Sequence, residues 1–126
     1  MNIPANLKYT KDHEWISIDG DIATVGITDF AQKELGDIVY VEVETLDQTL
    51  EKDEVFGTVE AVKTVSDLFL PVTGEIIAFN DALESTPESV NADPYGAGWM
   101  IKVKIANMTE VSDLLSSESY KELIGA

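Results

Sequence analysis

Apolar and polar residues alternate along several short stretches of the chain, which is typical of strands buried on one face. Residues 15–18 and 22–27 flank the pair Asp19-Gly20, so they predict a β-hairpin. Residues 38–44 and 101–105 predict two further strands. One face of the strand at 38–44 would consist of Val39, Val41 and Val43. Many short strands separated by turns predict a mainly β fold, either a sandwich or a flattened barrel.

Helical signals are few and short. Thr28 can cap a helix over residues 29–35, and Gly36 can end it. Residues 109–115 and 117–124 predict two more helices near the end of the chain. The last helix would bury one face that carries Tyr120, Leu123 and Ile124.

The length of 126 residues and a hydrophobic content of 44% predict one domain with one core, residues 1–126. We expect the β core to span roughly residues 15–105 and a helical extension to follow at 109–126. Residues 80–98 contain two prolines and few aliphatic side chains, so they predict an ordered surface loop.

Lys63 stands out because of the residues around it. Alternating apolar residues precede and follow it, and these predict two short strands: Val59, Ala61 and Val62, then Val65, Leu68 and Leu70. A Pro-x-x-Gly turn, from Pro71 to Gly74, comes soon afterwards. The amine of Lys63 would then stand in water at the tip of a hairpin. Such a lysine is either an ordinary solvated surface residue or a site that an enzyme acylates selectively.

Composition restricts the chemistry that the chain can perform by itself. It has no cysteine and one histidine, His13, which excludes thiolate and multi-histidine zinc sites. The absence of cysteine also fits a reducing compartment, and any thiol chemistry must come from a prosthetic group. No apolar run approaches the ~20 residues of a membrane span. The first residues lack the features of a signal or transit peptide, so we expect a cytoplasmic location and no membrane partner.

The net charge of −16 comes from 24 acidic residues against 8 lysines and no arginine. Binding to nucleic acid depends on cations that neutralise phosphates, so nucleic acid is a poor candidate partner. The charge either serves solubility alone or steers the protein towards basic patches on partner proteins. It also favours a monomer, because copies of the chain repel one another.

Several motifs recur together along the chain. Around the central lysine they comprise Glu60, Val62, Lys63, Ser66, Asp67, Pro71, Gly74 and Glu75. Elsewhere they comprise His13-Glu14-Trp15, Ile27-Thr28-Asp29, Leu35-Gly36-Asp37 and Gly98-Trp99-Met100. These motifs, in this order and over nearly all of the chain, resemble the H protein of the glycine cleavage system. Biotin carriers are less similar because they flank the lysine with methionines, and 2-oxoacid dehydrogenase lipoyl domains place Asp before it.

This resemblance implies a lipoyl/biotinyl-type barrel-sandwich hybrid of two antiparallel sheets, with short helices and a C-terminal helical segment. It implies lipoic acid in amide linkage to Lys63, with Glu60 and Gly74 in recognition of the attachment site. The protein would be a non-catalytic carrier that takes the aminomethyl group of glycine from a pyridoxal-phosphate glycine decarboxylase to an aminomethyltransferase. Dihydrolipoamide dehydrogenase would then reoxidise the dithiol, and a lipoate ligase or octanoyltransferase would attach the group.

The resemblance also implies a cleft for the loaded arm. Glu14 and Asp67 match carboxylates that face the arm, and they would keep its amine protonated and so protect it from decomposition. Asp12 would share a strand face with Glu14 if this stretch is extended. Phe30 stands where many H proteins have a histidine, and it offers only apolar packing. His13 would be a structural hydrogen-bonding residue. Surface carboxylates of an acidic protein are the plain alternative for the acids.

Two other functions remain open at this point. The chain could pass octanoyl or lipoyl groups on to 2-oxoacid dehydrogenases, and Lys63 would be needed for that role too. It could instead be an independent enzyme or an unmodified binding module. A single histidine and the absence of cysteine and arginine make an enzyme a poor candidate, and the intact attachment motif argues against an unmodified module.

Overall fold

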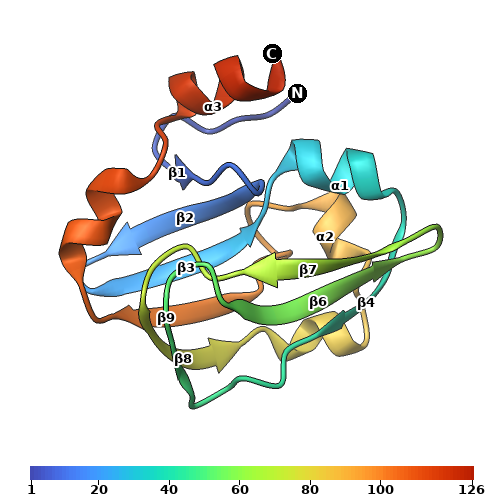
Figure 1. Ribbon diagram of the computed structural model, residues 1–126. Helices are drawn as coiled ribbons and strands as arrows, with labels where there is room; N and C mark the ends of the chain where they lie inside the picture. The colour runs from blue at the N-terminus through green and yellow to red at the C-terminus, as the bar shows by residue number, and fades with distance from the viewer.

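The computed structural model describes residues 1–126 and consists mainly of two antiparallel β-sheets (Figure 1). The larger sheet has the strand order β1-β2-β3-β9-β8-β5, and the smaller has the order β4-β6-β7. The strands are β1 (Lys8–Tyr9), β2 (Glu14–Asp19), β3 (Ile22–Ile27), β4 (Ile38–Glu42), β5 (Thr49–Leu50), β6 (Val55–Ala61), β7 (Val65–Phe69), β8 (Gly74–Phe79) and β9 (Ile101–Ile105). The predicted mainly β fold with two antiparallel sheets is confirmed.

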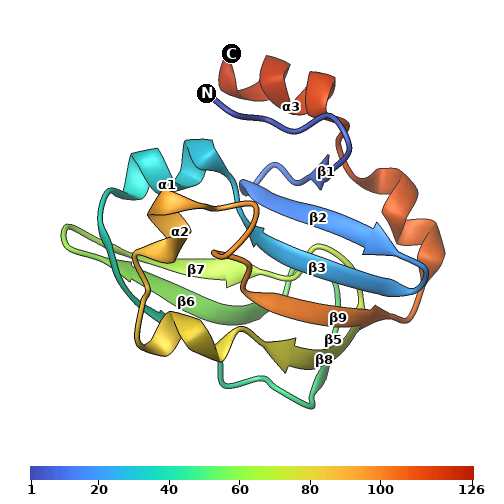
Figure 2. The same cartoon turned by 180° about the vertical axis from the view of Figure 1, so that it is seen from behind.

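The helical elements are short and lie outside the sheets (Figure 2). They are α1 (Asp29–Leu35), η1 (Asp81–Glu84), α2 (Ser89–Ala92), η2 (Met108–Asp113) and α3 (Ser117–Ile124). The helix predicted at 29–35 is confirmed with both ends: Thr28 accepts a hydrogen bond from the Ala31 N–H, and Gly36 follows at φ +81°. None of these helices combines the length and the apolar character that crossing a membrane requires.

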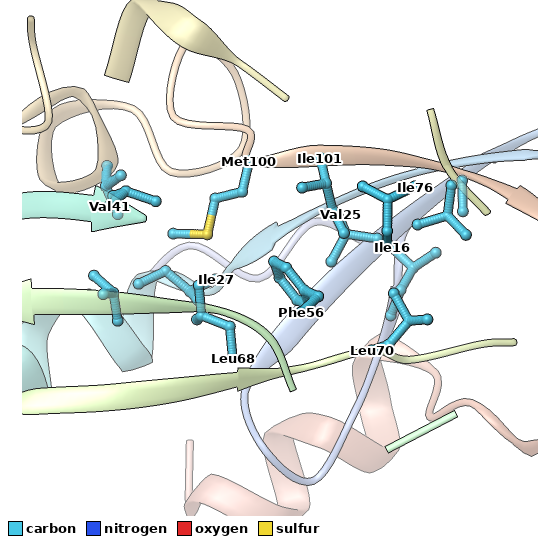
Figure 3. Close-up of a cluster of buried hydrophobic side chains, with 14 of the residues drawn as sticks. Ile16, Val25, Ile27, Val41, Phe56, Leu68, Leu70, Ile76, Met100 and Ile101 are labelled. Carbon is cyan, nitrogen blue, oxygen red and sulfur yellow. The ribbon is translucent and has the colours of Figure 1, made fainter. Parts of the chain in front are cut away.

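The two sheets enclose one core of 21 buried apolar residues (Figure 3). Ile16 and Val25 of the larger sheet point towards Phe56 and Leu68 of the smaller sheet, and Met100 fills the space at one end. All five side chains are at most 2% exposed. Burying a side chain of this size contributes about 1.5–3 kcal/mol, so the core holds the two sheets at a fixed separation.

A second, smaller cluster attaches the C-terminal helix to the larger sheet. It consists of Ile3, Leu7, Tyr9, Trp15 and Tyr120. The rings of Tyr9 and Tyr120 stack with centroids 4.8 Å apart and an angle of 8° between their planes. Both chain termini lie on this side of the molecule (Figures 1 and 2).

The strand predicted at 38–44 exists over residues 38–42, and of its predicted face Val41 is buried and Val43 packs against the core, but the placement of Val39 is wrong. Ile38 and Val41 are buried, whereas Val39 and Tyr40 are both 45% exposed. The cause is an irregularity in the pairing with β6, where Ile38 lies opposite Ala61 but Tyr40 lies opposite Glu60. One extra residue on β4 shifts the alternation by one position, which is the effect of a β-bulge.

Other predictions near the end of the chain need smaller corrections. The helix expected at 109–115 is the 3₁₀ segment η2, and the loop expected at 80–98 contains η1 and α2. The helix predicted at 117–124 is confirmed, but only part of its predicted face is covered. Tyr120 is fully buried and Ile124 packs against the second cluster, whereas Leu123 is 51% exposed.

Candidate functional site

Lys63 lies in the turn between β6 and β7, and this hairpin extends beyond the body of the protein (Figure 1). The turn is closed by a hydrogen bond from the Ala61 N–H to the Thr64 carbonyl, 2.8 Å. The Val62 N–H donates to the Asp37 carbonyl, 3.1 Å, and so ties the tip to the segment between α1 and β4. These two hydrogen bonds hold the backbone of the turn in place, while the Lys63 side chain is exposed.

The Lys63 side chain lies over Gly36, the residue that ends α1. A Cβ atom at Gly36 would be 3.6 Å from Cε of Lys63 and 4.0 Å from its Nζ. The Gly36 backbone, at φ +81° and ψ −155°, is a conformation available almost only to glycine. The Asn91 side chain holds this segment by donating to the Gly36 carbonyl and accepting from the Ile38 N–H, both at 2.9 Å.

A cavity of about 330 Å³ lies between α1, β7 and the turn before β2. Its lining includes four carboxylates and no lysine: Asp12, Glu14, Glu34 and Asp67. Its apolar lining comprises Ile27, Phe30, Ala31, Leu35, Val59 and Leu68, and His13 and Ser66 complete it. The four residues predicted for the cleft, Asp12, Glu14, Phe30 and Asp67, are thus brought to one cavity. A cavity lined by carboxylates without a countercharge favours a cationic ligand.

Glu14 is the most deeply buried of the four carboxylates, with 2% of its surface exposed. Oε1 accepts a hydrogen bond from the Thr10 hydroxyl, 2.5 Å, and Oε2 accepts a long one from the Phe69 N–H, 3.4 Å. Burial raises the pKa of Glu14 from 4.5 to about 7, the hydrogen bonds offset part of this rise, and the charge of Asp12 adds to it. Near neutral pH the carboxyl group is therefore poised between its two forms.

The residues before Glu14 form a turn rather than a strand. The His13 N–H donates to the Thr10 carbonyl, 3.1 Å, and His13 takes a left-handed conformation at φ +71°. The expectation that Asp12 and Glu14 share a strand face is therefore wrong, because the strand begins only at Glu14. Asp12 is exposed and reaches the cavity from its rim, whereas Glu14 points into its floor.

His13 has the structural hydrogen-bonding role that the sequence predicts. Its Nδ1 is 2.9 Å from the Tyr120 hydroxyl, which is also 2.7 Å from the Thr28 hydroxyl. The imidazole packs against Phe30 with ring centroids 4.8 Å apart, so α3 supports one wall of the cavity through Tyr120. Burial lowers the pKa of His13, although Asp12 and Glu34 oppose this, and the imidazole is therefore mainly neutral at pH 7.

Comparisons with known proteins agree with this geometry. The family model described as glycine cleavage H-protein matches residues 7–126. The chain belongs to this family. The H proteins of Bacteroides fragilis and Chlorobium luteolum are 59% and 60% identical to it over 126 and 127 residues, covering 99% or more of each chain. The crystal structure of the Mycobacterium marinum H protein superimposes with a TM-score of 0.90 at 40% identity, covering 98% of this chain and all of that one.

As a member of the H-protein family, the chain is a lipoyl carrier of the glycine cleavage system. The residues present fit such a group. The Lys63 side chain lies over Gly36, and the preceding residues Glu34 and Leu35 line the cavity, so the lysine and the cavity are neighbours. The volume of about 330 Å³ is at the small end of ligand pockets, roughly 300–1,000 Å³, and its walls offer both apolar and anionic surface.

The two residues predicted to mark the attachment site lie in different places. Glu60 is exposed on β6, three residues before Lys63. Gly74 begins β8, at the opposite end of the molecule from the hairpin tip (Figures 1 and 2). A Cβ at Gly74 would lie within van der Waals overlap of the Lys104 carbonyl and the Val103 side chain. The close contact between β8 and β9 therefore explains why position 74 requires a glycine.

Sequence reasoning missed three residues that shape the site. Glu34 lines the cavity one helical turn after Phe30, and the i, i+4 spacing was the signal that could have found it. Thr10 donates a hydrogen bond to the buried Glu14 carboxylate, but this contact depends on the turn between the two residues, and no sequence motif predicts that turn. Tyr120 reaches His13 from 107 residues away, and only the fold brings the two together.

Proposed function

We propose that Lys63 carries the lipoyl group and that the cavity beside the hairpin holds the loaded end of the arm. The observation that carries this proposal is that the exposed Lys63 side chain lies over Gly36, next in sequence to Glu34 and Leu35, which line the carboxylate-rich cavity. The attached group would supply a cyclic disulfide, one sulfur of which would take up the aminomethyl unit of glycine as the S–S bond breaks, and a dithiol would remain once that unit is passed on. The residues of the chain present this group, shield it and set its electrostatic surroundings.

The cavity suits a cargo that ends in an amine. Apolar side chains, among them Phe30, Leu35 and Leu68, would exclude water from the methylene groups and sulfur atoms of the arm. Glu14 and Asp67 would face the amine and favour its protonated form, since a nearby negative charge raises the pKa of an amine. A protonated nitrogen has no free lone pair, so the cargo would decompose more slowly in the cavity than in water.

The burial of Glu14 matches this role. An ionised carboxylate is unfavourable in the cavity by itself, which is why the pKa of Glu14 rises to about 7. An ammonium group beside it would reverse that preference and hold the carboxylate in its charged form. The site would therefore bind the cationic cargo more strongly than the neutral one.

The individual partners follow from the family and are part of the proposal. We assign the protein a non-catalytic role as the common substrate of glycine decarboxylase, an aminomethyltransferase and dihydrolipoamide dehydrogenase. Tethering keeps the one-carbon unit at a high effective concentration between these enzymes. We expect a cytoplasmic monomer. Transfer of lipoyl groups to other acceptors is the second candidate, but no contact in the structure favours it.

Intact mass after incubation with lipoate, ATP and a lipoate ligase tests the attachment site. We expect one lipoyl increment in the native chain and none in Lys63→Arg, which keeps the charge and the length of the side chain. Glycine-dependent CO₂ exchange with the decarboxylase then separates the cleavage-system carrier from a lipoyl relay. A native chain that gains no increment, beside an acceptor that does, would refute the carrier role.

Release of formaldehyde from the loaded protein tests the cavity. Glu14→Gln and Asp67→Asn keep the shape of each side chain but remove its charge. We expect each to release formaldehyde faster than the native chain, by about tenfold for Glu14→Gln, since a hydrogen bond to a charged group contributes about 1.5–3 kcal/mol. Glu44→Gln, on the surface away from the cavity, is the matched control. Equal release from all four proteins would exclude protection by these carboxylates.

A further inference from the structure

A separate cavity of about 390 Å³, which we call the outer cavity, lies on the face of the larger sheet that points away from the core. Its lining comes partly from β2, β3 and β9, which lie side by side (Figure 2). Three aromatic side chains contribute to its walls: Trp15, Tyr95 and Trp99. It shares no lining residue with the cavity beside Lys63, so a ligand bound here would serve a function beyond the proposed carrier role.

Hydrogen bonds to the backbone fix two of these aromatic side chains. The Trp15 indole N–H donates to the Pro94 carbonyl, 2.9 Å, and the Tyr95 hydroxyl donates to the Asn2 carbonyl, 2.6 Å. Gly26 leaves room for the indole on the sheet, because a Cβ atom there would be 2.7 Å from Nε1 of Trp15. The walls of the outer cavity are therefore formed before any ligand binds, as is usual for small-molecule sites.

Strand pairing places three polar side chains in a row along the outer cavity. Ser17 of β2 lies opposite Thr24 of β3, and Thr24 lies opposite Lys102 of β9. Residues that are opposite in this way have Cβ atoms about 4.5–5.5 Å apart, so two hydroxyl groups and one ammonium group line one short stretch of the cavity. All three groups can donate hydrogen bonds to the same ligand.

The charge of the outer cavity differs from that of the other cavities. Its lining includes Lys102 and no carboxylate, whereas each of the other three cavities is lined by at least two carboxylates. Lys104, on the same face of β9, lies opposite Glu75 of β8, but Lys102 lies opposite Ala78 and takes part in neither ion pair of the protein. Its Nζ instead lies 5.4 Å from the centroid of the Trp99 ring. Lys102 is therefore available to an anion that enters the cavity.

We propose that the outer cavity binds a small aromatic carboxylic acid in its ionised form. The carboxylate would accept hydrogen bonds from the Lys102 ammonium group and the Thr24 hydroxyl. The ring would pack against Tyr95 and Trp99, which are only half-buried and so offer accessible ring surface. One lysine matches one negative charge. A phosphate monoester carries nearly two, and the net charge of −16 would repel it more strongly.

Proton–nitrogen NMR spectra of the isotope-labelled full-length chain test the proposal, because both tryptophans of the chain line the outer cavity. Their two indole N–H signals report binding directly, and Trp99→Phe identifies which signal belongs to which residue. The probes are benzoate, which has a ring and a charge, and benzamide, which has nearly the same shape and no charge. We expect benzoate to shift the indole signals with a Kd of about 1 mM, since so small a ligand has few atoms to bury. We expect benzamide to bind about fivefold more weakly, the effect of one ion pair at an exposed lysine.

Lys102→Gln and Lys104→Gln form a matched pair of variants, because each removes one exposed lysine from the same face of β9. We expect Lys102→Gln to bind benzoate about fivefold more weakly than the native chain does, and no more tightly than it binds benzamide. Lys104→Gln should keep the preference of the native chain for benzoate, and the backbone signals of each variant verify its fold.

Three results would overturn the proposal. The first is equal binding of benzoate and benzamide by the native chain, since the charge would then play no part. The second is a preference for benzoate that survives in Lys102→Gln, because another group would then bind the carboxylate. The third is the absence of any shift of the indole signals at about 10 mM benzoate, roughly ten times the expected Kd.

Discussion

Replacing Glu14 by glutamine is expected to change how the stability of the protein depends on pH. Glu14 is 2% exposed, and burial raises its pKa from 4.5 to about 7. Between these two values the unfolded chain has lost the Glu14 proton, whereas the folded chain still holds it. The folded state therefore binds more protons in this range, and the free energy of unfolding falls as the pH rises.

The size of the effect follows from the change in pKa. One pKa unit corresponds to about 1.4 kcal/mol, so the ionised Glu14 costs the fold about 3 kcal/mol once the pH is above 7. Of this cost, about 2.5 kcal/mol develops between pH 5 and pH 8. Glu14→Gln has no proton to lose. Its amide has one acceptor oxygen in place of two, so it loses one of the bonds that the carboxylate accepts from the Thr10 hydroxyl and the Phe69 N–H, but that loss is the same at every pH.

Urea unfolding followed by tryptophan fluorescence measures the free energy of unfolding at each pH, because Trp15 is buried in the folded protein. The informative quantity is the free energy of unfolding of the native chain minus that of Glu14→Gln, taken at each pH from 5 to 8.5. The other acidic residues are common to both proteins, so their repulsion largely cancels in this difference. Glu44→Gln, an exposed glutamate, corrects for the loss of one surface charge.

We expect the difference to fall by about 2.5 kcal/mol between pH 5 and pH 8 and then to level off. The native chain minus Glu44→Gln should show almost no slope. Parallel pH profiles for the native chain and Glu14→Gln would refute the reasoning, since Glu14 would then titrate at the same pH in the folded and unfolded states. A fall centred well below pH 6 would mean that water or Thr10 solvates the carboxylate better than the burial indicates.

Three further outcomes are expected. The ratio of formaldehyde release rates, Glu14→Gln over the native chain, should rise with pH and level off with a midpoint below pH 7, because the cargo ammonium lowers the pKa of Glu14 from about 7 in the empty cavity. Tyr120→Phe keeps the stacking on Tyr9 but leaves His13 and Thr28 without their shared hydroxyl, so urea unfolding should show a loss of about 1–3 kcal/mol. Gly36→Ala forces alanine into a conformation suited to glycine, and the same measurement should show a loss of roughly 1–3 kcal/mol.

Local patterns predict much of this fold because local chemistry sets its elements. The hairpin of β2 and β3, the capped helix α1 and the alternation in β9 depend on neighbours in sequence, and all three are confirmed. Val39 was assigned to the wrong face of β4 because one extra residue opposite β6 shifts the alternation there. Pairing between strands distant in sequence decides that register, and no pattern within residues 38–44 records it.

The functional site, like the fold, could be predicted from the sequence only in part. A motif indicates Lys63, and short-range pairing places it at a hairpin tip. The resemblance indicated four residues of the cavity, but its shape and the rest of its lining could not be predicted, because its walls come from α1, β7 and the turn before β2. The left-handed backbone conformation of His13 places Asp12, which is exposed, at the rim of the cavity and Glu14, which is buried, at its base. Alternation alone would have placed the two acids side by side.

Because Glu14 is buried, docking of a cationic cargo would be linked to release of the Glu14 proton. At pH 7 the carboxyl group of Glu14 is about half protonated, because its pKa is near 7. An ammonium group that entered the cavity would lower this pKa, so docking would release up to about half a proton per molecule at that pH. Undocking would take the proton up again. The cost of holding an ionised Glu14 in the empty cavity, about 3 kcal/mol, would thus be offset when a cation is present, and the cavity would discriminate loaded arms from unloaded ones by charge.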